Sequence, residues 1–178
     1  MKLPSSITLC EVGLRDGLQN EATLLTVHQK VVLLLGLIDA GFKVIEVGSF
    51  MHPKAVPNQV YDLCSHVRSA YPECSWWLHF HNTRGMAMAN ILSALEAGMT
   101  RFDSSFGGLG GCPFVPGAAG NISTEDVLHM CEESGIETGI DITKVIALSR
   151  NLRSLLGHDM ESYILRAGRS SDLIRSNQ

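Results

Sequence analysis

The sequence predicts an α/β fold in which helices pack outside a parallel sheet. Short apolar segments alternate with amphipathic helical segments, glycines follow several of the helices, and polar residues gather just after the expected strands. The chain has 178 residues, 45% hydrophobic and 18% charged, so residues 1–178 can bury a core as one domain. A net charge of −4 and the lack of a long basic block give no reason to expect a nucleic-acid partner.

Cysteine content and hydropathy predict a cytoplasmic protein. The cysteines stand at positions 10, 64, 74, 112 and 131, an odd number without a Cys-x-x-Cys pair, which fits a reducing cytosol better than a disulfide scaffold. The first residues show neither a secretory apolar region nor a transit pattern. The longest strongly apolar run, residues 31–38, is far shorter than the roughly 20 residues that cross a bilayer, so we expect no membrane partner.

Strands and helices are expected to alternate along the chain. The expected strands are the apolar segments 7–12, 43–48, 76–81 and 101–105, with a very short fifth strand possible near residues 118–122. Helical stripes cover residues 26–40, 60–67, 86–97, 123–135 and 142–156, and the polar tail from residue 168 is expected to be loose. Four or five strands are fewer than the eight of a closed (β/α)₈ barrel, which usually takes about 250 residues.

Local signals mark the ends of two helices. Thr26 and Gln29 have the spacing of a capping box at a helix N-terminus, and Gly41 is a typical residue at a helix C-terminus. Ser123 is the expected N-cap of the helix that follows the glycine-rich loop.

Two histidines at alternate positions are candidates for a metal site. His79 and His81 lie on or at the end of the third expected strand, where both side chains point to one face and Phe80 points to the other. Two neutral imidazoles at this spacing can share one divalent metal ion. The alternative is a pair of half-buried, hydrogen-bonded structural histidines.

Charged residues at the ends of the first two strands are further candidates. Asp16 could supply an oxygen ligand beside the imidazoles, and Arg15 could hold the negative charge of an oxyanion; a surface ion pair is the alternative for both. Glu46 lies within an apolar strand and could line the site, or it could occupy an ordinary exposed edge position. Glu11 has the same two interpretations.

The long loop that begins near residue 106 is rich in glycine and contains a thiol. Four glycines precede Cys112, so the loop suits a mobile lid, and the thiol could donate a proton or act as a nucleophile. An incidental cysteine in a flexible loop is the alternative. Asn121, further along, could be a carbonyl ligand or a helix N-cap near Ser123.

Together these segments resemble the 3-hydroxy-3-methylglutaryl-CoA lyases, which are metal-dependent TIM-barrel enzymes of the pyruvate carboxyltransferase-like group. The resemblance is carried by Glu11-Val12-Gly13-Leu14-Arg15-Asp16-Gly17-Leu18-Gln19-Asn20-Glu21, by Val44-Ile45-Glu46, by His79-Phe80-His81-Asn82-Thr83-Arg84-Gly85, and by Gly108-Leu109-Gly110-Gly111-Cys112-Pro113 through Gly120-Asn121 to Thr124-Glu125-Asp126. It implies an incomplete fold derived from the TIM barrel, with about four to five parallel strands and outer helices. The segment with the third to fifth strands of the barrel is missing, and the expected junction is near residue 59.

The resemblance implies specific roles for residues of this chain. The metal ligands would be Asp16, His79, His81 and Asn121, and the cation would be Mg²⁺ or Mn²⁺. The catalytic residues would be Arg15, Glu46, His79 and Cys112. The chain departs from the family at Asn82, where the lyases usually have Asp, so the tuning of the neighbouring ligand is expected to differ.

The reaction implied is the retro-Claisen cleavage of 3-hydroxy-3-methylglutaryl-CoA to acetyl-CoA and acetoacetate. The cation acts as a Lewis acid on the substrate oxygens, and His79 is the expected base for the C3 hydroxyl. Arg15 stabilises the enolate of acetyl-CoA, and Cys112 supplies the final proton. The partner would be an acyl-CoA thioester, and unpaired strand edges left by the missing segment favour a homo-oligomer.

Two other functions remain open from the sequence. The chain could be a non-catalytic remnant that folds only by association. It could instead be a condensing relative that uses acetyl-CoA in the opposite direction, although the glycine loop with its cysteine argues against this.

Overall fold

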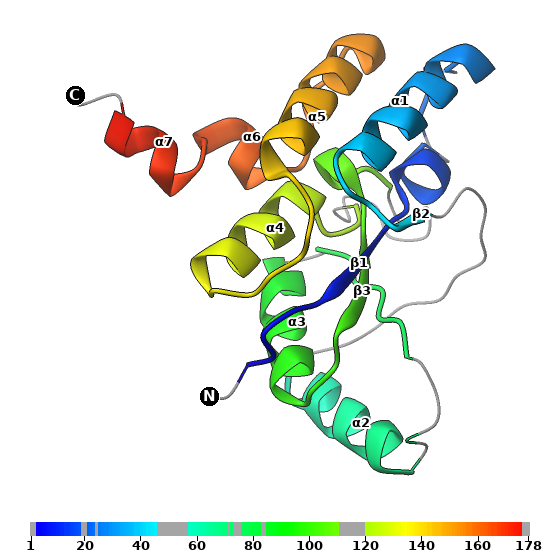
Figure 1. The fold of residues 1–178 in the computed structure, drawn as a ribbon. Helices are drawn as coiled ribbons and strands as arrows, with labels where there is room; N and C mark the ends of the chain where they lie inside the picture. Colours follow the sequence, from blue (N-terminus) through cyan, green and yellow to red (C-terminus); the bar gives the residue numbers. More distant parts are fainter. Residues whose placement is uncertain are drawn as a thin grey trace.

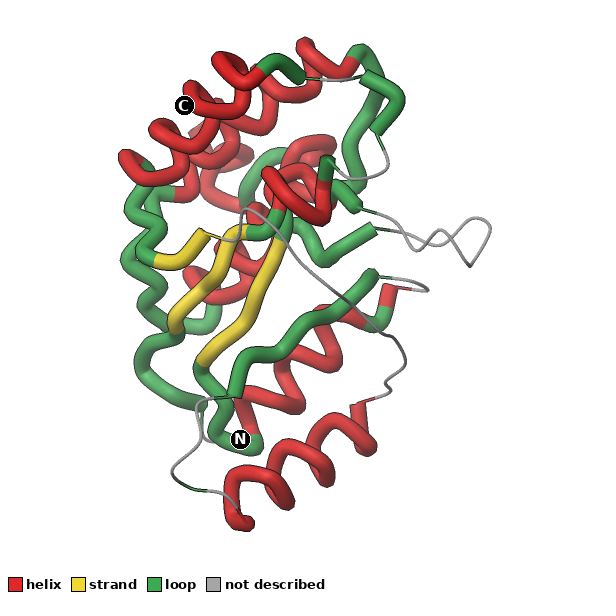
Figure 2. Tube along the Cα trace, turned by 90° about the vertical axis from the view of Figure 1, so that its right-hand side faces the viewer, coloured by secondary structure: helices red, strands yellow, loops and turns green. Residues whose placement is uncertain are grey.

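A small parallel sheet lies at the centre of the molecule, with helices on both sides (Figure 1). The structure, a computed structural model, describes residues 3–18, 21–23, 25–45, 57–70, 72, 76–82, 85–110 and 120–175. The three strands are β1 (Thr8–Glu11), β2 (Val44–Ile45) and β3 (Arg101–Ser104), in the order β2-β1-β3. Both pairings are parallel: Cys10 faces Val44, and residues 8–11 face residues 101–104. The side-by-side arrangement of the strands is clear in Figure 2.

Seven α-helices surround this sheet in the described part of the chain. They are α1 (Val27–Asp39), α2 (Pro57–Ala70), α3 (Ala87–Glu96), α4 (Thr124–Glu133), α5 (Ile142–Leu156), α6 (Tyr163–Ala167) and α7 (Ser170–Arg175). A π-helical turn, η1 (Gly13–Gly17), follows β1, and a 3₁₀ turn, η3 (Phe106–Gly108), follows β3. In Figure 1, α4 and α5 lie on one side of the strands, and α2 and α3 lie at the lower end. β1 and β3 are therefore each followed by a short helical turn, whereas the residues directly after β2 lie outside the described set.

The core is built by one face of each helix and by the strands between them. Leu33 and Leu37 of α1, Ile91 and Leu95 of α3, and Phe102 of β3 are almost completely buried. At about 25 cal/mol per Å² of apolar surface removed from water, each such side chain contributes roughly 1.5–3 kcal/mol. Three regular strands and their helices thus share one continuous hydrophobic core.

The third expected strand is present only as an extended segment. Residues 76–82 run parallel to β3, where Leu78 pairs with Phe102 in a single bridge, and the Leu78 N–H donates to the Arg101 carbonyl (3.1 Å). Further on, His81 pairs with Asn121 in an antiparallel bridge, and Ser105 pairs with Ser123 in a parallel one. Of the possible fifth strand near residues 118–122, the structure describes residues 120–122, where Asn121 forms the isolated bridge to His81.

The tail contradicts its sequence-based expectation, because residues 170–175 form α7 instead of a loose segment. The Asp172 carboxylate accepts from the Arg169 N–H (3.0 Å), and the Ser170 hydroxyl donates to Glu133 of α4 (2.6 Å). These hydrogen bonds hold the helix in place, although the tail is rich in polar residues. The second half of the expected strand 43–48 lies outside the described residues.

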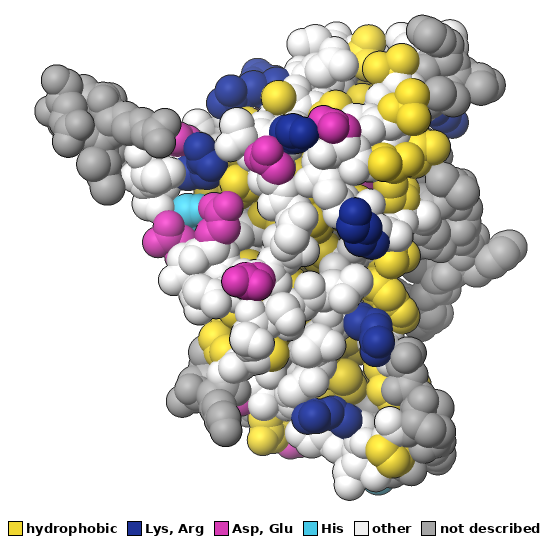
Figure 3. Space-filling model, in the orientation of Figure 1, with side chains coloured by type: hydrophobic (Ala, Val, Ile, Leu, Met, Phe, Trp, Pro, Cys, Tyr) yellow, Lys and Arg dark blue, Asp and Glu magenta, His cyan; other side chains and the backbone are white. Residues whose placement is uncertain are grey.

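The outer face of α1 exposes apolar side chains. Val32, Leu35 and Ile38 are 47%, 60% and 51% exposed, and their spacing of three residues places them on one side of the helix. Figure 3 shows hydrophobic side chains gathered over α1 at the upper right. In the described part of the chain, no helix is long and apolar enough to cross a bilayer.

Candidate functional site

The histidine pair lies beside the carboxyl half of β3. The Asp103 N–H donates to the Leu78 carbonyl (3.1 Å), so the backbone holds His79 next to Asp103. The imidazoles of His79 and His81 are 5.0 Å apart between ring centroids and are inclined at 72°. The alternation expected for an extended segment therefore brings both rings together, and it buries Phe80 among the core residues.

A carboxylate that the sequence interpretation overlooked binds the first histidine. Both carboxylate oxygens of Asp103 lie 2.9 Å from Nδ1 of His79. The His79 and Asp103 side chains are 25% and 17% exposed, so water competes only partly for this contact. The sequence contained a weak signal for it, since Asp103 is charged in a strand whose neighbours Phe102 and Ser104 are buried.

Asn121 is tied to the loop that follows β3. Its Nδ2 donates to the Leu109 carbonyl (3.0 Å), and its backbone N–H donates to the Gly110 carbonyl (2.9 Å). Because a carbonyl only accepts, the Leu109 contact identifies the nitrogen side of the amide. The N-cap of α4 is Ser123 and not Asn121, because the Ser123 hydroxyl accepts from the Asp126 N–H.

The turn after β1 packs against the same loop. A Cβ placed on Gly17 of η1 would come within 2.8 Å of Ser105 Oγ and of Leu109 Cβ, which shows how close the two backbones run. Arg15 and Asp16 belong to η1, whereas their side chains lie outside the described set. Leu109 thus lies close to η1 and accepts from Asn121, so the segments that carry Arg15, Asp16 and Asn121 meet at the carboxyl ends of β1 and β3.

The remaining predicted residues cannot be placed. Glu46 and Cys112 lie outside the described residues. Among the described residues, no group of three or more His, Cys, Asp and Glu side chains is arranged around a metal position. The predicted ligand set of two imidazoles, one amide oxygen and one carboxylate is chemically suitable for a divalent cation such as Mg²⁺ or Mn²⁺.

A buried carboxylate, Glu11, lies beneath these turns. Its Oε1 accepts from the N–H groups of Gly13 (2.7 Å) and Phe106 (3.0 Å), and its Oε2 accepts from Thr124 Oγ1 (2.6 Å). The side chain thereby joins the start of η1 to the start of η3. Burial raises the pKa of Glu11 to about 8, although the Thr124 hydroxyl and the two N–H groups oppose the shift. The sequence allows Glu11 either to line the site or to occupy an exposed edge position. The second interpretation is wrong, because the side chain is completely buried.

A second buried carboxylate, Glu125, holds η3 from the other side. It accepts from the Gly107 N–H (2.9 Å to Oε2), from the Ser123 hydroxyl (2.6 Å) and from the Ser149 hydroxyl. Burial is also the main reason why the pKa of Glu125 is raised. Apart from the position of Glu125 in the first turn of an expected helix, nothing in the sequence indicates this contact.

Comparison with known proteins identifies the family. The HMGL-like family model matches this chain in two stretches, residues 6–55 and 50–152. Hydroxymethylglutaryl-CoA lyase YngG of Bacillus subtilis is 35% identical over 145 residues, which cover 82% of this chain and 48% of that protein. The (R)-citramalyl-CoA lyase of Chloroflexus aurantiacus is 42% identical over 114 residues, which cover 64% of this chain and 36% of the relative. The chain thus spans less than half the length of these curated relatives.

Solved structures agree on the fold. An HMG-CoA lyase from Acinetobacter baumannii, in complex with coenzyme A and 3-methylmalate, superposes with a TM-score of 0.86 at 30% identity, and the alignment covers 97% of this chain and 98% of that one. The hydroxymethylglutaryl-CoA lyase of Pseudomonas aeruginosa gives a TM-score of 0.76 at 22% identity and covers 99% of this chain and 100% of the other. The fold is thus a partial form of the TIM barrel of these enzymes, and the chain belongs to the HMGL-like family.

Proposed function

We propose that this chain is a divalent-metal-dependent lyase that cleaves 3-hydroxy-3-methylglutaryl-CoA into acetyl-CoA and acetoacetate. The observation that carries the proposal is the meeting of η1, residues 79–81 and Asn121 at one end of the sheet. His81 pairs with Asn121, and Asn121 binds Leu109, which packs against η1. Sites of parallel α/β folds are built at this end. The homologous lyases provide the reaction class.

Four residues would hold the cation: Asp16, His79, His81 and Asn121. A bound Mg²⁺ or Mn²⁺ supplies Lewis acidity toward the substrate oxygens. Arg15 would bind the developing enolate through its guanidinium, and Cys112 would deliver the proton that completes acetyl-CoA. Glu46 would line the mouth of the same site.

The contact with Asp103 restricts the role of His79. Nδ1 is used by the carboxylate, so only Nε2 can carry a free electron pair. An imidazole that gives this pair to a cation cannot take a proton from the substrate at the same time. The proposal therefore keeps His79 as a ligand and no longer uses it as the base.

Citramalyl-CoA is the second candidate substrate. The (R)-citramalyl-CoA lyase is 42% identical to the chain over 114 residues, a higher identity over a shorter stretch than YngG shows. Turnover of both thioesters by the same preparation would separate the two specificities.

The short chain also favours self-association. The exposed residues Val32, Leu35 and Ile38 form an apolar stripe on α1, and β2 has a partner on only one side among the described strands. We propose that the chain forms a homo-oligomer, that residues 1–178 are one domain, and that a segment is missing near residue 59. The non-catalytic remnant remains the alternative if the associated chain is inactive.

The test is release of acetyl-CoA from 3-hydroxy-3-methylglutaryl-CoA by the full chain with Mn²⁺, repeated with excess EDTA. The variants His81→Ala and Cys112→Ala should lose the release, whereas His66→Ala should keep it because His66 is an exposed residue of α2. A folded sample that binds Mn²⁺ without releasing acetyl-CoA contradicts the catalytic proposal. Consumption of acetyl-CoA with a 2-oxo acid would favour the condensing relative.

A further inference from the structure

The symmetric contact between Asp103 and His79 determines where the imidazole can carry its proton. Both carboxylate oxygens lie 2.9 Å from Nδ1. An ionised carboxylate has no proton to donate, so a neutral imidazole in this contact must carry its hydrogen on Nδ1. The electron pair of the ring is then on Nε2.

We propose that Asp103 is a positioning residue that holds His79 in the Nδ1–H tautomer, so that Nε2 is the nitrogen that binds a divalent cation. This inference rests on the proposed function, because it takes His79 to be a metal ligand. Histidines that bind metals commonly give their other N–H to a carboxylate, which fixes the tautomer and the plane of the ring. Here the carboxylate comes from β3 and the histidine from the neighbouring extended segment.

The backbone makes this pair a fixed feature of the fold. The Leu78 N–H donates to the Arg101 carbonyl, and the Asp103 N–H donates back to the Leu78 carbonyl, both at 3.1 Å. These backbone bonds flank the two side chains and fix the position of His79 relative to Asp103. Two long surface side chains that met by chance would have no such backbone support. The Asp103 side chain is also short, so little conformational entropy is lost when it points at His79.

A single substitution can reverse the tautomer without changing the shape of the side chain. The amide of Asp103→Asn can donate to Nδ1, which moves the ring hydrogen to Nε2 and blocks that nitrogen as a ligand. The same change at the aspartate of a serine-protease triad leaves the geometry intact and stabilises the wrong tautomer. Asp39→Asn is the matched control, since it removes one charge from an exposed residue of α1 that pairs with Lys144.

The first measurement is the affinity of the full chain for Mn²⁺. The chain is titrated with Mn²⁺, and electron paramagnetic resonance reports the concentration of free Mn²⁺. Asp103→Asn should weaken binding by about 10–100-fold, as expected for the loss of a carboxylate behind a ligand, and Asp39→Asn should bind as the wild type does. Circular dichroism of each variant checks that it is folded. Unchanged Mn²⁺ affinity in a folded Asp103→Asn chain overturns the proposal.

The second measurement works without metal and without catalysis. Proton–nitrogen correlation spectra of the imidazoles distinguish Nδ1–H from Nε2–H, and His79→Gln identifies the signal that belongs to His79. The metal-free wild type should show Nδ1–H, and a wild type with Nε2–H overturns the proposal even if Asp103→Asn does not fold. A wild type that shows Nδ1–H and yet binds no Mn²⁺ contradicts the metal-dependent function, while the positioning of His79 by Asp103 stands.

Discussion

Glu11 and Thr124 are separated by 113 positions in the sequence, and a hydrogen bond of 2.6 Å joins their side chains inside the core. The bond connects the end of β1 to the first turn of α4. Thr124 Oγ1 also lies 2.7 Å from the Ser104 hydroxyl at the end of β3. The two stretches that match the family model are therefore held together at the same end of the sheet where η1 approaches Leu109, the partner of Asn121.

Burial of Glu11 should make the stability of the chain depend on pH. The pKa of this carboxyl is about 8 in the folded chain, against 4.5 for an ordinary glutamate. Between these values the folded chain keeps a proton that the unfolded chain releases, so the free energy of unfolding should fall as the pH rises. The slope from one such group is at most about 1.4 kcal/mol per pH unit, and the raised pKa of Glu125 acts in the same direction.

The variant Glu11→Gln checks this assignment. Glutamine copies the protonated carboxyl, because its oxygen can accept from Gly13 and Phe106 while its amide donates to the Thr124 hydroxyl. Urea unfolding from about pH 5 to about pH 8 should show a weaker pH dependence than in the wild type. Glu96→Gln, at an exposed position of α3, should leave the dependence unchanged, and equal slopes in wild type and Glu11→Gln contradict the prediction.

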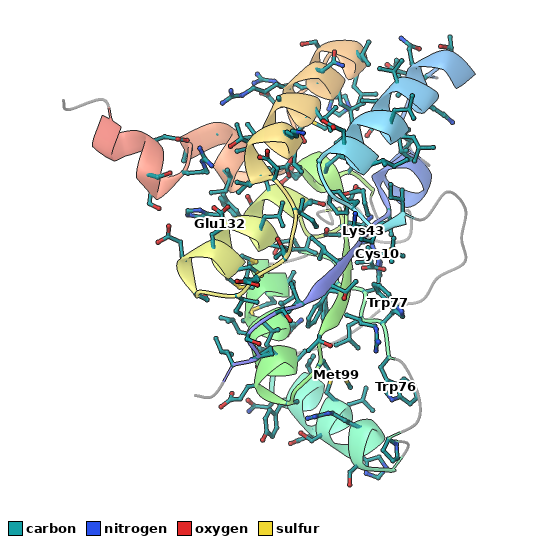
Figure 4. All side chains as sticks on the ribbon, in the orientation of Figure 1. Cys10, Lys43, Trp76, Trp77, Met99 and Glu132 are labelled. Atoms are coloured by element: carbon teal, nitrogen blue, oxygen red, sulfur yellow. The ribbon has the colours of Figure 1, made fainter. Side chains whose placement is uncertain are left out.

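Truncation of Glu125 should destabilise the chain strongly. Glu125→Ala removes the acceptor of the Gly107 N–H and of the Ser123 and Ser149 hydroxyls, all of them buried. At about 1–3 kcal/mol for each unsatisfied buried group, the free energy of unfolding should fall by about 3 kcal/mol or more. Glu132→Ala is the control on the same helix, because Glu132 lies on the outward side of α4 (Figure 4) and should cost at most about 0.5 kcal/mol. Similar losses in both variants would rule out the buried network as the cause.

Local features of the fold could be predicted from the sequence. Thr26 and Gln29 form the expected capping box, with the Gln29 N–H donating to Thr26 Oγ1 (3.2 Å) and the Thr26 N–H donating to Gln29 Oε1 (2.8 Å). Such a motif depends on residues three positions apart, so its spacing is visible in the sequence. The helix stripes were predictable for the same reason.

Contacts between distant segments could not be predicted. Asp103 lies 24 positions from His79, and only the pairing of the extended segment with β3 brings the two together. The sequence alone does not decide between the two interpretations of Glu11, because its partners Phe106 and Thr124 come from the far half of the chain. The roles of Arg15, Asp16, Glu46 and Cys112, which their positions suggest and the family resemblance makes specific, remain predictions.

The apolar stripe on α1 should drive self-association. Leu35 is 60% exposed between Val32 and Ile38, so Leu35→Glu places a charge at the centre of the stripe without disturbing the buried Leu33 and Leu37. The wild type should elute as an oligomer in size-exclusion chromatography with light scattering, and Leu35→Glu should shift it toward the monomer. Ala167→Glu, at an exposed position of α6, should leave the mass unchanged. A monomeric wild type contradicts the proposed homo-oligomer.

Substitution of two glycines with the same backbone conformation distinguishes the cost of backbone strain from the cost of a steric clash. Gly108 in η3 and Gly135 after α4 have φ values of 67° and 68°, a left-handed conformation that costs an L-residue roughly 1–2 kcal/mol. A Cβ on Gly108 would lie 2.8 Å from the carbonyl oxygen of Glu161, whereas one on Gly135 would meet nothing within 4 Å. Gly108→Ala should therefore lower the free energy of unfolding by at least about 1 kcal/mol more than Gly135→Ala, because the Glu161 backbone must move as well. Chemical denaturation of both variants measures the difference, and equal losses would mean that the loop after β3 is not packed against residue 161 in solution.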